Sequence, residues 1–172
     1  KSKLGLYDNK YYARKLEIKK VDNQERNLFF ELNHLHGDTN SLFAFGLYKN
    51  NELIQCISFR KHKEGLEIAR FSSKLNTNIS GGFSRLLNYC NNYIKEQYPN
   101  INKIITYCDR DWTPIYKNSV YYKNGFNFIK DSGNILKYVD NKNNVYSRQK
   151  FQKHKIKDMF DDYNNENVNE FL

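Results

Sequence analysis

The chain has 172 residues, of which 39% are hydrophobic and 16% are aromatic, and its net charge is +9. This length is enough for one domain with a buried core, and no apolar run approaches the roughly 20 residues of a transmembrane helix, so we exclude a membrane-spanning protein. Residues 158–172 carry five acids and no base, so the remainder carries +14. Such a charge indicates a polyanionic partner, nucleic acid above all, although a solvated surface in a lysine-rich and asparagine-rich protein gives the same composition.

The first half of the chain has clear secondary-structure signals. Asp22 and Glu25 form a capping box, which predicts a helix that runs to Leu35 with one apolar face. Alternating or apolar runs predict strands, and Asn50-Asn51 joins two of them as a hairpin. The expected strands are residues 11–21, 42–48, 52–59 and 65–73.

A glycine pair, Gly81-Gly82, follows a polar run over residues 74–80 and opens an amphipathic helix that ends before Pro99. A glycine loop at this place leaves backbone N–H groups pointing outward, with the positive end of the helix dipole behind them. Many phosphate sites are built in this way, and many ordinary loops look the same.

The second half continues the alternation of strands and helices. Residues 103–109 form an apolar strand of the central type. A helix is expected over residues 113–125, with Thr113 as its N-cap and Pro114 at its first position. Strands over 126–130 and 135–140 and a basic helix from about residue 147 follow. We expect a single domain over residues 1–157 and a frayed acidic tail over 158–172.

The location follows from the cysteines and the start of the sequence. Cys56, Cys90 and Cys108 are odd in number and form no CxxC pair, which is typical of reduced thiols in an intracellular protein. The first ten residues contain no apolar segment of a signal peptide. We therefore expect a cytoplasmic protein.

The element order β-α-β-β-β-α-β-α-β-β-α resembles that of the GNAT acyltransferases, as do the glycine loop and the junction "YYKNGFNFI". The resemblance implies an α+β, three-layer fold around a mixed central sheet. It also implies that Gly81, Gly82 and Ser84 hold the pyrophosphate of an acyl-CoA, with Arg70 beside them to attract phosphate. The residues alone establish no cofactor. Phe83 stands where the family has a small residue, so we expect it to crowd the cradle and to make acyl-CoA binding weak.

A longer run of segments resembles a phage-encoded GNAT-like domain that follows nuclease domains in homing-type endonucleases. The resemblance implies a DNA-binding module with a nuclease upstream in the same chain. More distantly, the arrangement is similar to the Mom family of phage DNA-modification proteins, which implies the alternative of a transferase acting on adenine N6. Whether the chain is an enzyme stays open. The segments are "YYARKLEIKKV", "NHLHG", "FGLYKNNELIQCISF", "LEIARFSSKLNTNISGGFSRLLNY", "IITYCDRDW", "YYKNGF" and "YSRQKFQKHK".

Three residues are candidates for catalysis. His34, just after a helix, and Asp109, at the end of an apolar strand, are candidate general bases. Tyr116 is the general acid that the GNAT resemblance implies. The alternatives are a histidine that interacts with the helix dipole, an aspartate paired with Arg85 or Arg110, and a tyrosine that packs on the sheet. We expect His34, Arg70, Asp109 and Tyr116 to share one crevice, and we find no metal-ligand spacing.

The candidate DNA contacts lie mainly near the C-terminus. Cations interleaved with Phe151 and Ile156 predict a helix that packs one face and presents the other to phosphates. Trp112 is a candidate for stacking on an exposed base. The expected cationic contacts are Arg148, Lys150, Lys153, Lys155 and Lys157.

Overall fold

The computed structural model describes residues 5–109, 113, 115–133, 137–147, 151–160 and 164. By compactness the chain divides into two units, Lys1–Phe128 and Ile129–Leu172. The predicted single domain over residues 1–157 spans both units and stays a prediction. None of the described helices is long and apolar enough to cross a membrane.

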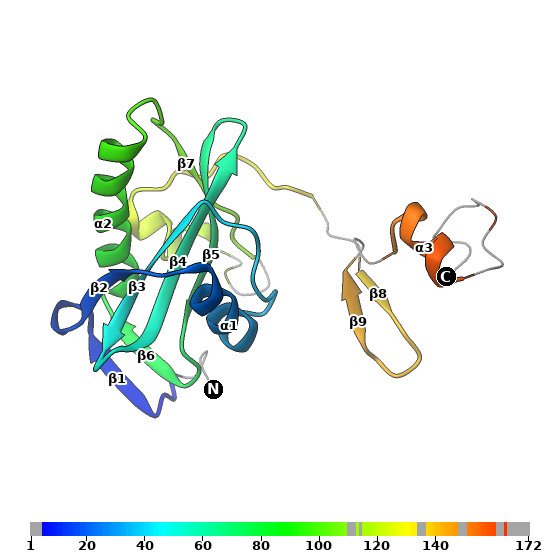
Figure 1. The fold of residues 1–172 in the computed structure, drawn as a ribbon, viewed down its shortest axis with the longest axis horizontal. Helices are drawn as coiled ribbons and strands as arrows, with labels where there is room; N and C mark the ends of the chain where they lie inside the picture. The colour runs from blue at the N-terminus through cyan, green and yellow to red at the C-terminus, as the bar shows by residue number, and fades with distance from the viewer. Residues whose placement is uncertain are drawn as a thin grey trace. The chain divides into compact units, whose positions relative to one another are not determined.

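The larger unit contains a mixed sheet in the order β2-β3-β4-β5-β7, in which only the β5–β7 pair is parallel. A separate two-stranded parallel sheet joins β1 and β6 (Figure 1). The strands are β1 Asn9–Tyr12, β2 Glu17–Lys20, β3 Phe43–Lys49, β4 Glu52–His62, β5 Gly65–Ser73, β6 Thr77–Ser80 and β7 Ile104–Ile105. The helices are α1 Asn23–Asn33 and α2 Gly82–Gln97, with short 3-10 turns η2 Ala13–Lys15, η3 Tyr116–Asn118 and η4 Tyr122–Asn124.

Helices α1 and α2 cover opposite faces of this sheet. Phe29 and Phe30 of α1 pack with a small cluster that includes Ala44 and Cys56. The apolar face of α2 packs with the larger cluster, which includes Leu47 and Ile57 of the same strands. Because successive side chains of a strand point to opposite faces, the two clusters mark the two sides of the sheet.

Several elements form as their local signals predict. The carboxylate of Asp22 accepts a hydrogen bond from the Glu25 N–H at 2.9 Å at the start of α1. Asn50 and Asn51 both have positive φ, 50° and 64°, as a tight hairpin between β3 and β4 requires. The predicted strand over 65–73 is confirmed with the same bounds.

A bulge in the pairing of β4 with β5 changes the face on which two charged residues lie. Arg70 pairs with Ser58 and Ile68 with Phe59, so Ala69 is the extra residue. Glu67 and Arg70, which strict alternation would place on opposite faces, therefore lie on the same face. Glu67 is buried and accepts two hydrogen bonds from Arg60, at 2.9 and 2.7 Å, so its charge is neutralised within the sheet.

Other predicted elements are wrong. The strand over 11–21 is broken by η2, and the polar run 74–80 contains strand β6. The strand over 103–109 shortens to β7, and residues 126–130 lie outside any strand. The helix over 113–125 is replaced by η3 and η4. One cause is the Ser119 hydroxyl, which accepts a hydrogen bond from the Tyr122 N–H at 3.0 Å and competes with the helical pattern.

The described residues of the smaller unit contain a hairpin followed by a short helix. Strands β8 Lys137–Val139 and β9 Val145–Ser147 are antiparallel, and α3 spans Lys153–Met159. The predicted helix from about residue 147 therefore begins six residues later, because Ser147 belongs to β9. The Phe151 ring packs against those of Tyr138 and Tyr146, with centroid separations of 5.0 and 5.8 Å.

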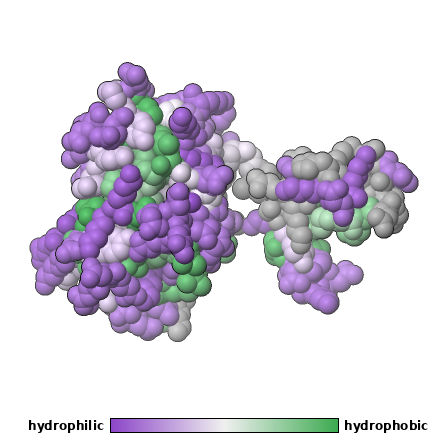
Figure 2. Space-filling view, in the orientation of Figure 1, coloured by the Kyte–Doolittle hydropathy of each residue, from purple (hydrophilic) through white to green (hydrophobic). Residues whose placement is uncertain are grey.

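The surface is largely polar, with some large apolar side chains in solvent. Leu28 and Leu32 of α1 and Leu35 just after it are 58%, 72% and 71% exposed. Figure 2 shows apolar side chains among hydrophilic ones on the face that carries α1.

Candidate functional site

The amino end of α2 is a group of backbone donors without intrahelical acceptors, where Gly81 is exposed, Ser84 is half-buried, and Gly82 and Phe83 are buried. Gly81 is the N-cap residue, with φ at 74°, and no side chain in the described part of the chain caps the helix. The N–H groups of Gly82, Phe83 and Ser84 have no acceptor within the helix, since the first intrahelical bond runs from the Arg85 N–H to the Gly81 carbonyl oxygen at 3.0 Å. With the helix dipole behind them, these donors favour an anion.

An open pocket of about 340 Å³ lies at this helix end. Its wall combines apolar side chains with a small number of polar ones, and the exposed Lys123 adds a positive charge. Ser84 is half-buried there. Gly81, Gly82 and Ser84, three of the four residues that the GNAT resemblance implies for the cofactor, line this pocket. The lining residues are Gln55, Phe71, Ile79, Gly81, Gly82, Phe83, Ser84, Val120, Lys123 and Asn124.

Gln55 is the residue of this pocket that sequence analysis missed. It lies on β4 opposite Leu47, on the face that α2 covers, and only 3% of it is exposed. Its amide nitrogen donates to the Ser73 hydroxyl at 2.8 Å, whereas its amide oxygen has no hydrogen-bond partner among the described residues. The available signal was the presence of polar residues, Gln55 and Ser58, within the apolar run over 53–59.

Gly82 permits the close approach of this side chain. A Cβ atom at residue 82 would lie 2.0 Å from Oε1 of Gln55 and 2.7 Å from its Cδ. Any larger residue would have to displace the carboxamide. Gly81 has a different reason to be glycine, because its φ lies in the left-handed region, whereas a Cβ there would meet nothing nearer than Ala13 at 4.0 Å.

Phe83 does not stand in front of the donors. Its ring is 4% exposed and packs edge-on against Phe71 and Tyr121, with centroid separations of 4.9 and 5.3 Å. The expectation that Phe83 crowds the cradle is therefore wrong in its reason, because the side chain belongs to the core and forms part of the pocket wall.

Tyr121 is a tyrosine that contacts the first turn of α2. Its ring contacts Phe83, and its hydroxyl is hydrogen-bonded to Thr106 just after β7. Burial raises the pKa of Tyr121 above its ordinary value. The GNAT resemblance in the sequence implied Tyr116 instead as the general acid.

Tyr116 lies on η3 and is 41% exposed. Its ring contacts those of Tyr122 and Phe128, each with a centroid separation of 5.3 Å. Asp109 is exposed on the segment that follows β7. Arg85, one of its suggested partners, donates instead to the carbonyl oxygens of Ala13 and Leu16. The catalytic roles of Asp109 and Tyr116 stay predictions.

His34 and Arg70 come together, but on the other face of the sheet. Arg70 pairs with Ser58, which in turn pairs with Ala44 of the cluster under α1. Its guanidinium donates to the carbonyl oxygens of Gly37 and Ala69, both at 2.8 Å, and so fixes the loop after α1. The prediction that places Arg70 beside the glycine loop is therefore wrong, whereas a crevice shared by His34 and Arg70 with Asp109 and Tyr116 stays a prediction.

The environment of His34 makes it a weak base. Burial first, and then the charges of Arg70 and His36, lower its pKa to about 4. Its Nδ1 accepts a hydrogen bond from the His36 N–H at 3.1 Å. At neutral pH the imidazole is uncharged and acts as an acceptor within its loop.

The expected DNA contacts are described only in part. Lys155 and Lys157 are exposed on either side of the buried Ile156. Trp112, Arg148 and Lys150 lie outside the described residues, and so does the side chain of Lys153. Among the described residues, no group of three or more His, Cys, Asp or Glu side chains could hold a metal ion.

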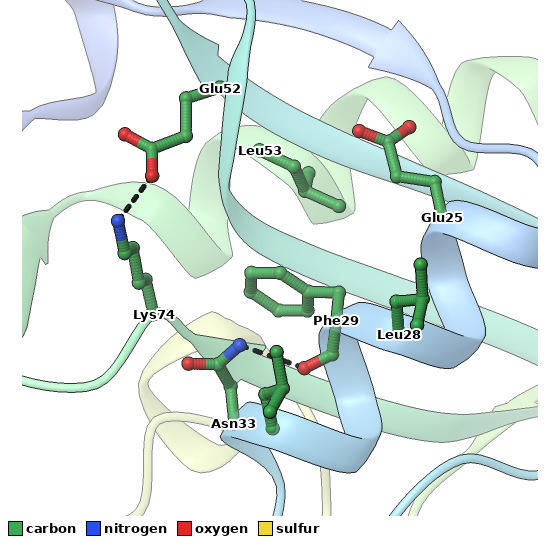
Figure 3. Close-up of a pocket in the computed structure, with 8 residues that line it drawn as sticks. Glu25, Leu28, Phe29, Asn33, Glu52, Leu53 and Lys74 are labelled. Atoms are coloured by element: carbon green, nitrogen blue, oxygen red, sulfur yellow. Dashed lines mark hydrogen bonds and ion pairs between the residues drawn. The ribbon is translucent and has the colours of Figure 1, made fainter.

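A second, more apolar hollow of about 230 Å³ lies between α1 and β4 (Figure 3). Leu28, Phe29 and Leu53 form its apolar part, and the ion pair between Lys74 and Glu52 lies at its edge. The carbonyl oxygen of Phe29 accepts a hydrogen bond from the side-chain amide of Asn33 at 2.8 Å. These polar groups already have partners, so this hollow offers less chemistry than the pocket at α2.

Comparison with known proteins shows likeness in structure alone. No family model and no curated protein matches the chain. A protein of unknown function from methicillin-resistant Staphylococcus aureus, described as a probable acetyltransferase, matches with a TM-score of 0.51 and 15% identity, over 72% of this chain and 99% of its own. An acetyltransferase of the GNAT family from Streptococcus pneumoniae matches with a TM-score of 0.50 and 16% identity, over 73% and 98%. The chain therefore has the GNAT-like acetyltransferase fold.

Proposed function

We propose that the protein is an acyltransferase that binds an acyl-CoA at the amino end of α2. The observation that carries the proposal is the set of uncapped N–H groups of Gly82, Phe83 and Ser84 at the edge of an open pocket. A pyrophosphate is an anion of the right kind for such donors, and Lys123 adds a charge that favours it. The GNAT-like fold supports the same assignment by analogy.

The residues of the site have separate tasks under this proposal. The three N–H groups hold phosphate oxygens, and the apolar walls formed by Phe71 and Ile79 exclude water from the adjoining part of the ligand. When bound, acyl-CoA supplies an activated acyl group. Asp109 is the candidate that accepts a proton from the attacking amine. His34 is a poor candidate, because its pKa is near 4 and it lies on the other face of the sheet.

Calorimetric titration with acetyl-CoA tests the cofactor site. Ser84→Pro removes one N–H donor in the first turn, where proline is tolerated, and Ser84→Ala is the matched control that keeps the donor. Loss of a hydrogen bond to a charged group costs about 1.5–3 kcal/mol, so we expect affinity to fall at least about tenfold in the proline variant only. Lys123→Gln should weaken binding without changing the fold. Wild-type protein that shows no saturable binding would refute the proposal.

A second proposal is binding of duplex DNA, which the charge distribution favours. Residues outside the acidic segment 158–172 carry +14. In α3, Ile156 is fully buried while Lys155 and Lys157 are exposed, so the helix presents its charges to solvent. Phosphate neutralisation releases counterions, and each contact contributes about −0.9 to the slope of log affinity against log salt.

Gel-shift titrations across salt concentrations test DNA binding. Changing Lys155 and Lys157 together to Gln should make the slope less steep by roughly 2, for every DNA sequence alike. The exposed Lys95 of α2, changed to Gln, is a control in the other unit. An unchanged slope in the double variant would contradict the proposed role of α3.

If the protein binds DNA, two roles are possible: it delivers a nuclease to DNA, or it is a transferase that modifies the DNA. A chain that delivers an upstream nuclease to DNA needs no acyl acceptor. A transferase related in function to the Mom proteins would modify adenine N6 in DNA. Mass spectrometry of nucleosides, from DNA isolated after co-expression with the protein, distinguishes them, because only the second leaves a modified adenine.

A further inference from the structure

Gln55 has a buried acceptor that the fold itself leaves unsatisfied. The residue is 3% exposed, and its Oε1 has no hydrogen-bond partner among the described residues. A buried acceptor without a donor destabilises the fold, so native proteins seldom keep one without a reason. The bond from its Nε2 to the Ser73 hydroxyl satisfies the amide nitrogen but not the amide oxygen.

The unsatisfied oxygen lies at the positive end of a helix. Oε1 would be 2.0 Å from a Cβ atom on Gly82, the first residue of α2. The dipole of α2 favours the oxygen over the NH₂ group at this place, which agrees with the orientation in which Nε2 points to Ser73. Gln55 also lines the pocket that the uncapped N–H groups border.

We infer that Gln55 is a ligand-binding residue of this pocket and accepts a hydrogen bond from an N–H or O–H group of the ligand. The inference rests on the proposed function and deepens it. The N–H groups of α2 require a phosphate, and Gln55 requires a donor on the same molecule. A phosphorylated chain that contains amide and hydroxyl groups, as the pantetheine arm of CoA does, meets both requirements, whereas inorganic pyrophosphate meets only the first.

The side chain can reach such a donor by giving up its bond to Ser73, which the bond to the ligand replaces. The final torsion of glutamine is broad, so the carboxamide can turn about it toward the pocket. Turning moves Oε1 away from the Cα of Gly82, where it makes at most a weak C–H contact, and toward a stronger donor.

Gln55→Met separates this role from a structural one. Methionine keeps the length and much of the volume of glutamine and removes both polar atoms. We expect the melting temperature of the ligand-free protein to stay the same or rise, because the unsatisfied acceptor is lost together with the Ser73 bond. We expect affinity for CoA to fall about five- to tenfold, and affinity for inorganic pyrophosphate to stay unchanged. Gln24→Met, at an exposed position of α1, is the matched control.

Calorimetry with CoA and with pyrophosphate, together with thermal melts, gives results that can be told apart. Wild-type protein that binds CoA while Gln55→Met binds it equally well would overturn this inference and leave the proposed function standing. A variant that melts several degrees lower and loses affinity for both ligands alike would show that Gln55 is structural. Wild-type protein that binds neither ligand would refute the proposed function and this inference together.

Discussion

Gly82→Ala should destabilise the protein through a contact with Gln55. The added methyl group would lie 2.0, 2.7 and 2.8 Å from Oε1, Cδ and Nε2 of that side chain. No such contact is tolerated, so the carboxamide must move. The backbone at Gly82 is not in the positive-φ region and accepts alanine without strain.

The expected loss follows from opposing terms. Moving the carboxamide breaks its bond to Ser73, worth about 0.5–1.5 kcal/mol, and crowding in a packed core costs about 1–3 kcal/mol. Replacing glycine by alanine in a helix returns about 0.5–1 kcal/mol, less at the first turn. The free energy of unfolding should therefore fall by about 0.5–4 kcal/mol, with a central value near 2 kcal/mol.

Urea denaturation followed by circular dichroism measures this loss, and a double-mutant cycle assigns it. In a Gln55→Ala background the clash is absent, so Gly82→Ala should be neutral or slightly stabilising, with a coupling energy of about 2 kcal/mol. Gly81→Ala is the control, because φ of 74° costs about 1–2 kcal/mol while the nearest atom is 4.0 Å away. Its effect should not depend on Gln55. Additive effects of Gly82→Ala and Gln55→Ala would refute the reasoning.

Three other outcomes are expected. The folded protein holds the pKa of His34 near 4, below its ordinary value of 6.5. Between these pH values the unfolded chain binds more protons than the folded one. The contribution of His34 to the free energy of unfolding is therefore fully present above about pH 6.5 and is lost as the pH falls toward 4. Urea midpoints across this range should depend less on pH in His34→Gln, and imidazole NMR should give the pKa directly. Asp38→Asn breaks a buried ion pair with Arg26, whose Nη2 lies 2.9 Å from the carboxylate. This change should lower the free energy of unfolding by about 3–5 kcal/mol. Glu17→Gln, at the exposed ion pair with Lys19, should lower it by less than about 1 kcal/mol. Phe83→Ala should lower unfolding free energy by about 3–5 kcal/mol, since the ring is buried, and a smaller loss would contradict its place in the core.

Local signals in the sequence were enough for several elements of the larger unit. The capping pair of Asp22 and Glu25, the Asn50-Asn51 turn and the helix opened by Gly82 each depend on residues within a few positions of one another. Such signals depend little on distant parts of the chain, and for this reason the GNAT-like fold class could be inferred.

Features that depend on distant partners could not be predicted in this way. Strand β6 looks like a polar loop, and it forms because Asn9–Tyr12 supplies a parallel partner. The bulge at Ala69 places Arg70 on the side of α1, and nothing near it in the sequence announces an extra residue. The polar atom of Gln55 meets the start of α2, which follows 27 positions later in the chain.

The two positions of the loop are thus glycine for different reasons. Gly81 is required by its backbone conformation, and Gly82 by the approach of another atom. In a phosphate loop that atom is expected to belong to the ligand, yet in this protein it belongs to Gln55, a residue of the sheet. If Gln55 turns toward a bound ligand, the space above Gly82 is vacated on binding, and the clash in Gly82→Ala disappears from the bound state alone. The stability of the free protein and its affinity for CoA then both depend on the position of the Gln55 carboxamide. The double-mutant cycle measures its contact with residue 82 in the free protein, and the CoA titration measures its contact with the ligand.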